Sequence, residues 1–323
     1  GRGGNRYGRL SAAIEAELVP ETHLLAEATI DRRDGLPVSE FDVISGLAGI
    51  GAYLLAHRAS PAMGSALKHA LDALSALVAG AGPDGVPWWW TPAEMLGDPA
   101  TVADHPNGAL NCGLAHGIPG PLALLALALT EEAPIPRLST ATAAAANWLS
   151  DHRSDDAWGI NWPTMVTLPD SPDRPDEPSR AAWCYGVPGV ARSLWLAGTA
   201  LRDEDLRTLA VDAMADLYRR PVFARHIDAP TLCHGVAGLL QVTLRFWHDT
   251  RDPMFAAAAA DLTDQLLDSY EPDGSLLGFR ATEPGGHRLD HAGLLDGAPG
   301  VALVLLAAAT DVEPSWDRLF LLS

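Results

Sequence analysis

The sequence predicts an all-α protein that folds as an α/α toroid, a double ring of inner and outer helices. Three observations predict this fold: a repeated glycine turn, an apolar stretch of helical length after each turn, and an amphipathic stretch between turns. A motif that repeats along a chain indicates that one supersecondary unit has been used several times. The turn has the form Gly-x-x-Gly and begins at Gly46, Gly117, Gly186, Gly235 and Gly297.

The apolar stretches after the turns predict the inner ring. They carry few charges on any face, which is typical of helices that are buried on all sides. Pro119, Pro188 and Pro299 lie within three of the turns, and the first turn of a helix tolerates proline. We therefore expect inner helices over residues 50–57, 121–129, 190–196, 239–247 and 301–308.

The segments between these stretches predict the outer ring. In residues 203–219, apolar side chains recur at steps of three and four, which places them on one face of a helix whose other face meets solvent. Segments of the same kind cover residues 62–78, 136–150 and 253–270. The turns are spaced too widely and too unevenly for a TPR or HEAT solenoid. The alternation of apolar and amphipathic helices therefore favours a closed ring.

Three long loops interrupt the helical pattern, over residues 82–108, 158–179 and 271–290. Loops of this length inside a compact domain are usually functional, and each precedes a glycine turn, so we expect them to rim the active-site end of the ring. For Trp88, Trp89 and Trp90 in the first loop, packing is favoured over contact with a substrate. No segment has the composition of a linker, which predicts one domain over residues 1–323, with residues 1–10 set apart as a disordered end or a cloning remnant.

Composition excludes several classes of partner. The formal net charge is −19, whereas nucleic acids and anionic membranes are bound by basic patches. No apolar run is long enough to span a membrane, and the first residues lack the apolar core of a signal peptide. Three cysteines are too few for a secreted disulfide framework, which favours a reducing cytosol. A chain of 323 residues buries a large core, so it needs no metal merely to hold its fold.

Two of the cysteines form the strongest chemical pattern. Cys184 and Cys233 each lie two residues before the first glycine of a turn, and His234 follows Cys233 directly. Thiolate and imidazole ligands suit zinc, and three protein ligands with one open position are typical of a catalytic site. The alternative is that both cysteines are ordinary buried thiols and that His234 is a satisfied core histidine. Cys112 is out of register with the other two and is interpreted as a buried thiol.

His116 is the leading candidate for acid–base chemistry. It precedes its glycine turn directly, in register with Tyr185 and His234, and we expect these side chains to face the same end of the ring. A histidine that is not a ligand can transfer protons near neutral pH, although it can equally be a structural residue at a helix cap.

Acidic and basic residues near the turns have two interpretations each. Asp42 lies four residues before Gly46 and could orient a histidine or accept backbone hydrogen bonds at a helix start. Arg180 could bind an anionic intermediate or pair with a surface carboxylate. For Asp296 and His291, near the last turn, structural roles are favoured.

These motifs together resemble the lanthionine synthetase C-like family of lanthipeptide cyclases. The resemblance rests on Trp-Cys-Tyr-Gly at 183–186, Cys-His-Gly at 233–235, Asn-x-Gly-x-Ala-His-Gly at 111–117 and Leu-Leu-Asp-Gly-x-x-Gly at 294–300. It extends from about residue 45 to the end of the chain. It implies the same toroid and one zinc ion held by Cys184, Cys233 and His234, with water or a substrate thiolate as the fourth ligand. It also implies His116 as the acid/base group, with Asp42, Arg180 and Tyr185 around it.

The resemblance implies a zinc-dependent, stand-alone cyclase. Such an enzyme adds cysteine thiolates of a dehydrated precursor peptide to dehydroalanine or dehydrobutyrine, which forms (methyl)lanthionine thioether rings. A dehydratase and an exporter would be its partners in a cytoplasmic complex, through which it could associate with a membrane. Two alternatives stay open: an enzyme that adds glutathione or another free thiol to dehydroamino acids, and a scaffold in which zinc only staples a peptide-binding ring. A terpenoid- or sugar-cleaving toroid is disfavoured, because paired catalytic carboxylates and an Asp-rich metal motif are not evident.

Overall fold

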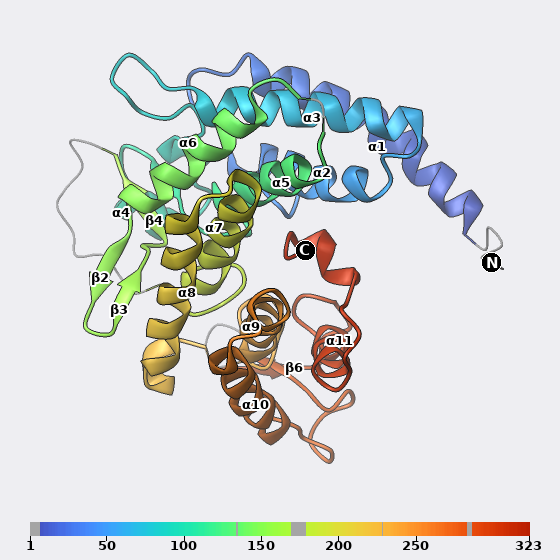
Figure 1. The fold of residues 1–323 in the computed structure, drawn as a ribbon, viewed down its shortest axis with the longest axis vertical. Helices are drawn as coiled ribbons and strands as arrows, with labels where there is room; N and C mark the ends of the chain where they lie inside the picture. Colours follow the sequence, from blue (N-terminus) through green and yellow to red (C-terminus); the bar gives the residue numbers. More distant parts are fainter. Residues whose placement is uncertain (1–6, 134, 169–178, 228, 283–285) are drawn as a thin grey trace.

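A computed structural model describes residues 7–133, 135–168, 179–227, 229–282 and 286–323. Figure 1 shows them as a ring of helical hairpins, which confirms the predicted all-α toroid. The inner helices are α2 (Leu47–Ala56), α5 (Pro119–Thr130), α7 (Val187–Leu201), α9 (Val236–Thr250) and α11 (Ala298–Ala308). Around them lie α1 (Gly8–Ile30), α3 (Pro61–Ala79), α6 (Leu138–Asp151), α8 (Glu204–Arg219) and α10 (Pro253–Asp268).

The packing order follows the order of the hairpins along the chain. Each inner helix packs against the next one, from α2 through α5, α7 and α9 to α11. Helix α3 covers α2, α6 covers α5, α8 covers α7 and α10 covers α9. Helix α1 packs against α3 and was not anticipated from the sequence. It begins at Gly8, inside the segment that was set apart as an end, while residues 1–6 lie outside the described part of the chain.

The glycine turns start the inner helices because the chain folds back on itself there at very short range. A Cβ atom on Gly186 would lie 1.9 Å from the carbonyl oxygen of Arg180, and its φ of +86° also favours glycine. A Cβ atom on Gly238 would lie 2.0 Å from the carbonyl oxygen of Leu232. In both cases the obstructing carbonyl belongs to the residue six positions earlier. The two glycines of the motif therefore let the incoming loop lie directly against the first turn of the helix.

The short strands lie in the long loops or directly next to them, and among the described residues they form three antiparallel pairs. Strand β1 (Ala109–Asn111) pairs with β4 (Met165–Thr167), which joins the end of the first loop to the second. Strands β2 (Ser154–Asp156) and β3 (Gly159–Asn161) form a hairpin, as do β5 (Ala281–Thr282) and β6 (Arg288–Leu289) in the third loop. The remaining helices are short: α4 (Pro99–Asp104), η1 (Val38–Glu40), η2 (Ala93–Met95), η3 (Val222–Arg225) and η4 (Trp316–Phe320).

The tryptophans of the first loop pack against the protein. Trp89 is buried and meets Trp148 of α6 edge to face, with ring centroids 4.7 Å apart. The guanidinium of Arg33 lies 3.9 Å from the ring centroid of Trp88, a cation–π contact. These contacts agree with the packing role expected for the two side chains.

The C-terminal segment brings a buried ion pair into the ring. Helix η4 contacts α2 and contributes Asp317, whose side chain is 0% exposed. Asp317 accepts hydrogen bonds from Arg245 of α9, at 2.5 and 2.6 Å, and from Gln241, at 2.6 Å. Arg245 is itself 1% exposed, so both charges depend on each other for compensation.

Replacing Asp317 by alanine is expected to lower the free energy of unfolding by roughly 3–5 kcal/mol, the usual effect of removing one partner from a buried ion pair. The guanidinium of Arg245 would stay in the core, with the exposed Glu313 as its remaining ion-pair partner among the described residues. Urea unfolding followed by circular dichroism measures the change. Asp311→Ala is the matched control, because Asp311 is exposed and its loss should change the free energy by no more than about 0.5 kcal/mol.

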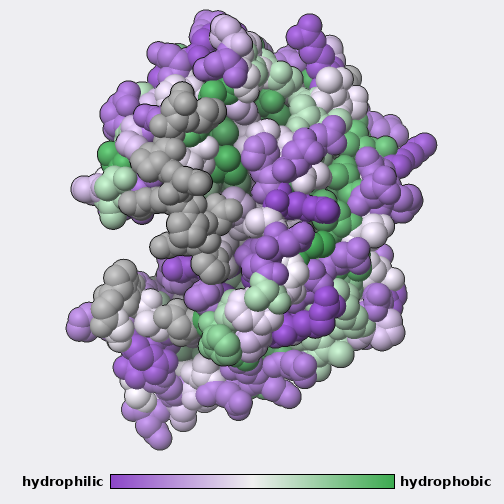
Figure 2. Space-filling model, turned by 90° about the vertical axis from the view of Figure 1, so that its left-hand side faces the viewer, coloured by the Kyte–Doolittle hydropathy of each residue, from purple (hydrophilic) through white to green (hydrophobic). Residues whose placement is uncertain are grey.

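The face drawn in Figure 2 is mostly hydrophilic, as the charge of the chain leads one to expect, and its left edge is hollowed by a notch. Within the described residues, no helix combines the length and the apolar character needed to cross a bilayer.

Candidate active site

A ladder of backbone hydrogen bonds joins the segments that enter the five glycine turns. The N–H of Val43 donates to the carbonyl of Ala115 (3.0 Å), and the N–H of Ala115 donates to that of Cys184 (3.1 Å). The N–H of Cys184 donates to Cys233 (3.1 Å), and the N–H of Cys233 donates to Leu295 (2.9 Å). From Ala115 onward the ladder holds equivalent positions of successive repeats side by side, and Val43 joins it one residue earlier in its own repeat. It explains why residues far apart in the sequence meet at one end of the ring.

The ladder places Cys184 against Cys233. Their side chains share a hydrogen bond, which lowers the pKa of Cys184 and raises that of Cys233, because the pair favours one thiolate that accepts from one thiol. Burial opposes the shift at Cys184, and the positive charge of Arg180 adds to it. Arg180 is exposed, and its charge also acts on His234. The two predicted thiol ligands are therefore neighbours, with a cation beside them.

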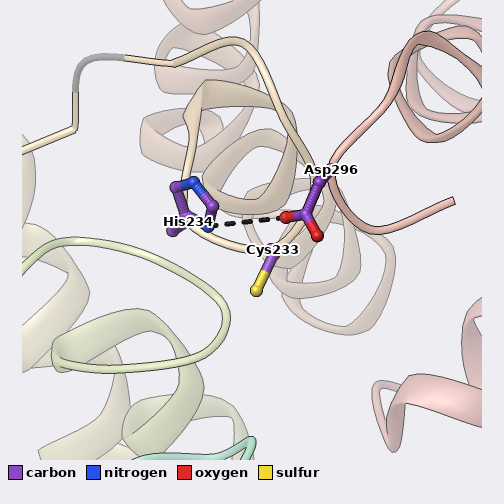
Figure 3. A group of neighbouring side chains, drawn as sticks. All are labelled: Cys233, His234 and Asp296. Carbon is purple, nitrogen blue, oxygen red and sulfur yellow. Dashed lines mark ion pairs between the residues drawn. The ribbon is translucent and has the colours of Figure 1, made fainter. Parts of the chain in front are cut away.

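Cys233, His234 and Asp296 form a group that could hold a metal ion. One potential ligand atom from each lies within 4.8 Å of the other two, and Figure 3 shows the three side chains converging from the segments before α9 and α11. Nδ1 of His234 lies 3.6 Å from Oδ1 of Asp296. The pKa of His234 is raised, first by a hydrogen bond with Cys233 and then, less, by the charges of Cys233 and Asp296.

The second cluster pairs His116 with Asp42. Nδ1 of His116 lies 2.7 Å from Oδ2 of Asp42, while Oδ1 of Asp42 accepts the backbone N–H groups of Ile44, Ser45 and Gly46 at 3.0, 2.7 and 2.9 Å. The Asp42 side chain is 2% exposed and that of His116 is 36% exposed. Both roles considered for Asp42 are thus present at once. The carboxylate is fixed by the helix start and orients the imidazole, which leaves Nε2 available to a bound molecule.

Tyr185 lies between the two clusters. Its ring centroid is 6.2 Å from that of His116, and its hydroxyl accepts a hydrogen bond from Nδ2 of Asn111 at 3.2 Å. The pKa of Tyr185 is raised, mainly by burial, and the negative charges of Cys184, Asp42 and Cys233 add to the shift. The phenol therefore stays protonated and can donate a hydrogen bond.

A cavity of about 180 Å³ opens beside His116 and Tyr185. Its other walls come from the strand pair β1–β4 and from η1, η2 and their flanks, and they are mostly apolar: Val38, Thr91, Met95, Leu96, Ala109, Asn111 and Met165. The first and second long loops thus rim this part of the site, as expected. The third loop contains β5 and β6.

The sequence-predicted residues gather at this end of the ring, and one more joins them. The ladder, the His116–Asp42 pair and the Tyr185 ring connect the predicted set, whereas Cys112 is a buried thiol outside any disulfide, as interpreted. Asp296 was given a structural role, yet it lies beside His234. The signal that would have found it is its register: like His116, it is the residue directly before a glycine turn.

A comparison with protein families decides the affiliation of the chain. The model of the lanthionine synthetase C-like proteins matches residues 14–321. The chain belongs to this family. Among curated proteins, the nisin biosynthesis protein NisC of Lactococcus lactis subsp. lactis is 24% identical over 208 residues. That alignment covers 62% of this chain and 45% of NisC, so the chain matches about half the length of that relative.

Solved structures show the same fold. A structure of nisin cyclase superposes with a TM-score of 0.82, covering 99% of this chain and 76% of that chain at 21% sequence identity. At this identity the likeness shows the α/α toroid and not the chemistry.

Proposed function

We propose that this lanthionine synthetase C-like protein is a zinc-dependent lanthipeptide cyclase. In this proposal it forms thioether rings by adding cysteine thiols of a dehydrated precursor peptide to dehydroalanine or dehydrobutyrine residues of the same peptide. The observation that carries the proposal is the meeting of a Cys–Cys–His donor set with an Asp–His pair at one end of the ring. Membership of the family and the names of the two relatives support it.

The donor set fits zinc. It consists of two sulfur atoms in hydrogen-bond contact and an imidazole on the residue after one of them. Sulfur and imidazole ligands bind zinc in preference to magnesium or calcium. Cys184, Cys233 and His234 would hold the ion. Zinc at such a site is a Lewis acid that deprotonates a thiol placed on it, so that the sulfur reacts as a thiolate at neutral pH.

The Asp42–His116 pair would supply the proton that the addition needs. When a thiolate sulfur bonds to the β-carbon of a dehydroamino acid, the carbon–carbon π electrons move to give an enolate. In its imidazolium form His116 would donate the Nε2 proton to the α-carbon, while Asp42 holds Nδ1 and stabilises the positive charge. The guanidinium of Arg180 and the hydroxyl of Tyr185 are the groups that could stabilise the enolate oxygen.

The cavity beside His116 would receive the dehydroamino acid. Its mostly apolar walls suit an alkene side chain, and two of its polar wall residues, Asn111 and Tyr185, already bond to each other. A residue seated there would have its α-carbon next to the imidazole. Holding both reactive ends of a peptide in this place turns ring closure into a short-range step.

Offering the metal-loaded protein a series of peptides, each with one dehydroalanine and one cysteine at a different spacing, tests the proposal. Ring closure leaves the mass unchanged and removes the thiol, so the product resists alkylation. The same peptides are offered with glutathione. A mass gain of one glutathione would favour the free-thiol enzyme, while metal binding without either product would favour the zinc-stapled scaffold.

We further propose that residues 1–323 act as one cyclase domain in the cytoplasm. A dehydrated precursor peptide is then the essential partner, and a dehydratase and an exporter would precede and follow the protein in a biosynthetic complex.

A further inference from the structure

Asp296 lies beside two of the three expected metal ligands, Cys233 and His234. Its backbone precedes α11, and its carboxylate points toward Cys233 and His234 in Figure 3. The three side chains, rather than Cys184, Cys233 and His234, form the group whose ligand atoms all lie within 4.8 Å of one another among the described residues. A carboxylate is a regular zinc ligand. Its position therefore needs an explanation beyond packing.

The distance between Asp296 and His234 is wrong for a hydrogen bond and right for two ligands. Oδ1 lies 3.6 Å from Nδ1, whereas an N–H···O bond usually spans about 2.7–3.2 Å. In a tetrahedral zinc site with Zn–N and Zn–O bonds of about 2.0–2.1 Å, the two ligand atoms lie roughly 3.3–3.4 Å apart. Figure 3 shows that the same nitrogen, Nδ1, faces Asp296, while the other ring nitrogen lies on the far side.

The hydrogen bonding of the Asp296 carboxylate also supports a role as a metal ligand. Oδ1 of Asp296 is buried, yet it has no hydrogen-bond partner among the described residues. Buried carboxylate oxygens are normally paired, and an oxygen that is not paired is accounted for by a water molecule or an ion. The other side of the carboxylate is open, since the Asp296 side chain is 48% exposed. The buried oxygen is thus aimed at the Cys–His group, and the carboxylate has room to swing away.

We propose that Asp296 is a fourth protein ligand of the metal, and that it is displaced when a substrate thiol enters. The proposal rests on the zinc site of the proposed function and deepens it. In the protein without peptide, two thiolates, one imidazole and one carboxylate surround the ion. An incoming thiol releases its proton to solvent, its sulfur takes the place of Oδ1, and the carboxylate stays ionised outside. One anionic ligand replaces another, so the net charge around the ion is unchanged.

The exchange gives the resting site a closed form. With Asp296 in place, no position is free for water or small anions, and the ion is held more tightly than three ligands alone would hold it. Only a ligand that competes with a carboxylate, such as a thiolate, opens the site. The ladder residue Leu295 fixes the backbone next to Asp296, so the exchange requires movement of the side chain only.

Cobalt(II) titration of the 323-residue protein tests this proposal without reference to turnover. Cobalt reports its ligands by absorption, and its affinity is measured by competition with a chelator. We expect Asp296→Asn to weaken cobalt binding by at least 10–100-fold, the range seen when only a supporting residue is removed, and to change the d–d spectrum. Asp273→Asn is the matched control, because it removes the same charge from an exposed position in the turn after α10.

The thiol step is tested with N-acetylcysteine as the probe. In the wild-type protein, its addition should raise the sulfur-to-cobalt charge-transfer band by about half, as two thiolates become three, and abolish the spectral difference between wild type and Asp296→Asn. Unchanged affinity in Asp296→Asn would overturn the proposal. So would a weaker affinity with an unchanged d–d spectrum, because it would make Asp296 a residue that only positions His234.

The outcomes separate this proposal from the proposed function. If the wild-type protein bound no stoichiometric cobalt, the Cys–Cys–His site itself would fail, and Asp296 with it. If cobalt bound and Asp296→Asn matched the wild type, the three-ligand site and the cyclase proposal would stand, and only the fourth ligand would be lost. Circular dichroism of each variant checks that the helical ring is intact.

Discussion

Replacing His116 by alanine is expected to reduce the rate of thioether formation by roughly 10²–10⁴-fold, the usual contribution of a general acid–base group. The helical ring and the bound metal should be unchanged. The imidazole contacts Asp42 and Tyr185 but neither cysteine in the described contacts, so its loss removes the proton donor and leaves the donor set in place. Single-turnover rates with a dehydrated peptide measure the effect, and metal content is determined in the same samples.

Two further variants sharpen this experiment. His69→Ala removes an imidazole from the exposed face of α3 and should leave the rate unchanged. Asp42→Asn keeps an oxygen for the backbone N–H groups of the helix start but turns an amide N–H toward His116, which disfavours the imidazolium. We expect a loss of roughly 10²-fold, at the lower end of the range for acid–base catalysis. A His116→Ala protein with wild-type rate would remove this residue from the mechanism.

The sequence predicts the inner ring well because its helices are specified locally. The Gly-x-x-Gly motif marks a backbone constraint, the close approach of a carbonyl from six residues earlier, and that constraint is the same in each repeat. Register then places Cys184, Cys233, His234 and His116 at one end of the ring. In the structure, this register appears as the backbone ladder, which hydrogen-bonds the segments before successive turns to one another.

Features that depend on contacts between distant segments were not predictable. Helix α1 buries only Thr22, Ala26 and Thr29 fully, and two of these are threonines, so its buried face gives a weak apolar signal in the sequence. The burial of Asp317 depends on Arg245, which lies on a different helix. Asp296 could have been suspected from its register, but an aspartate before a glycine is more often a turn or cap residue. Its distance from His234 depends on how two separate segments pack in the tertiary structure.

Replacing Cys233 by alanine is expected to remove the metal, reducing its affinity by more than about 100-fold, since even the loss of a supporting residue costs about 10–100-fold. Cys233 is central to the donor set: it shares a hydrogen bond with Cys184, another with His234, and lies in the group with Asp296. Metal analysis of the purified variant beside the wild type measures the loss. Thioether formation should disappear with the metal.

The fold of the Cys233→Ala protein discriminates between an enzyme and a scaffold. The core is continuous through all five inner helices, and burial on this scale does not need a metal for stability. We therefore expect circular dichroism and urea unfolding close to those of the wild type without metal. If zinc only stapled the ring, fold and function would be lost together, and His116→Ala would lose neither.

The variants Cys184→Ala and Cys112→Ala test the second sulfur ligand, because each removes one buried thiol but from different surroundings. Both thiols are buried and free of disulfides, but only Cys184 shares a hydrogen bond with Cys233. If Cys184 is a ligand, Cys184→Ala should lose the metal as Cys233→Ala does, while Cys112→Ala should retain it. Retention of metal by Cys184→Ala would instead assign the ion to Cys233, His234 and Asp296, and two thiolates would no longer surround the site of thiol activation.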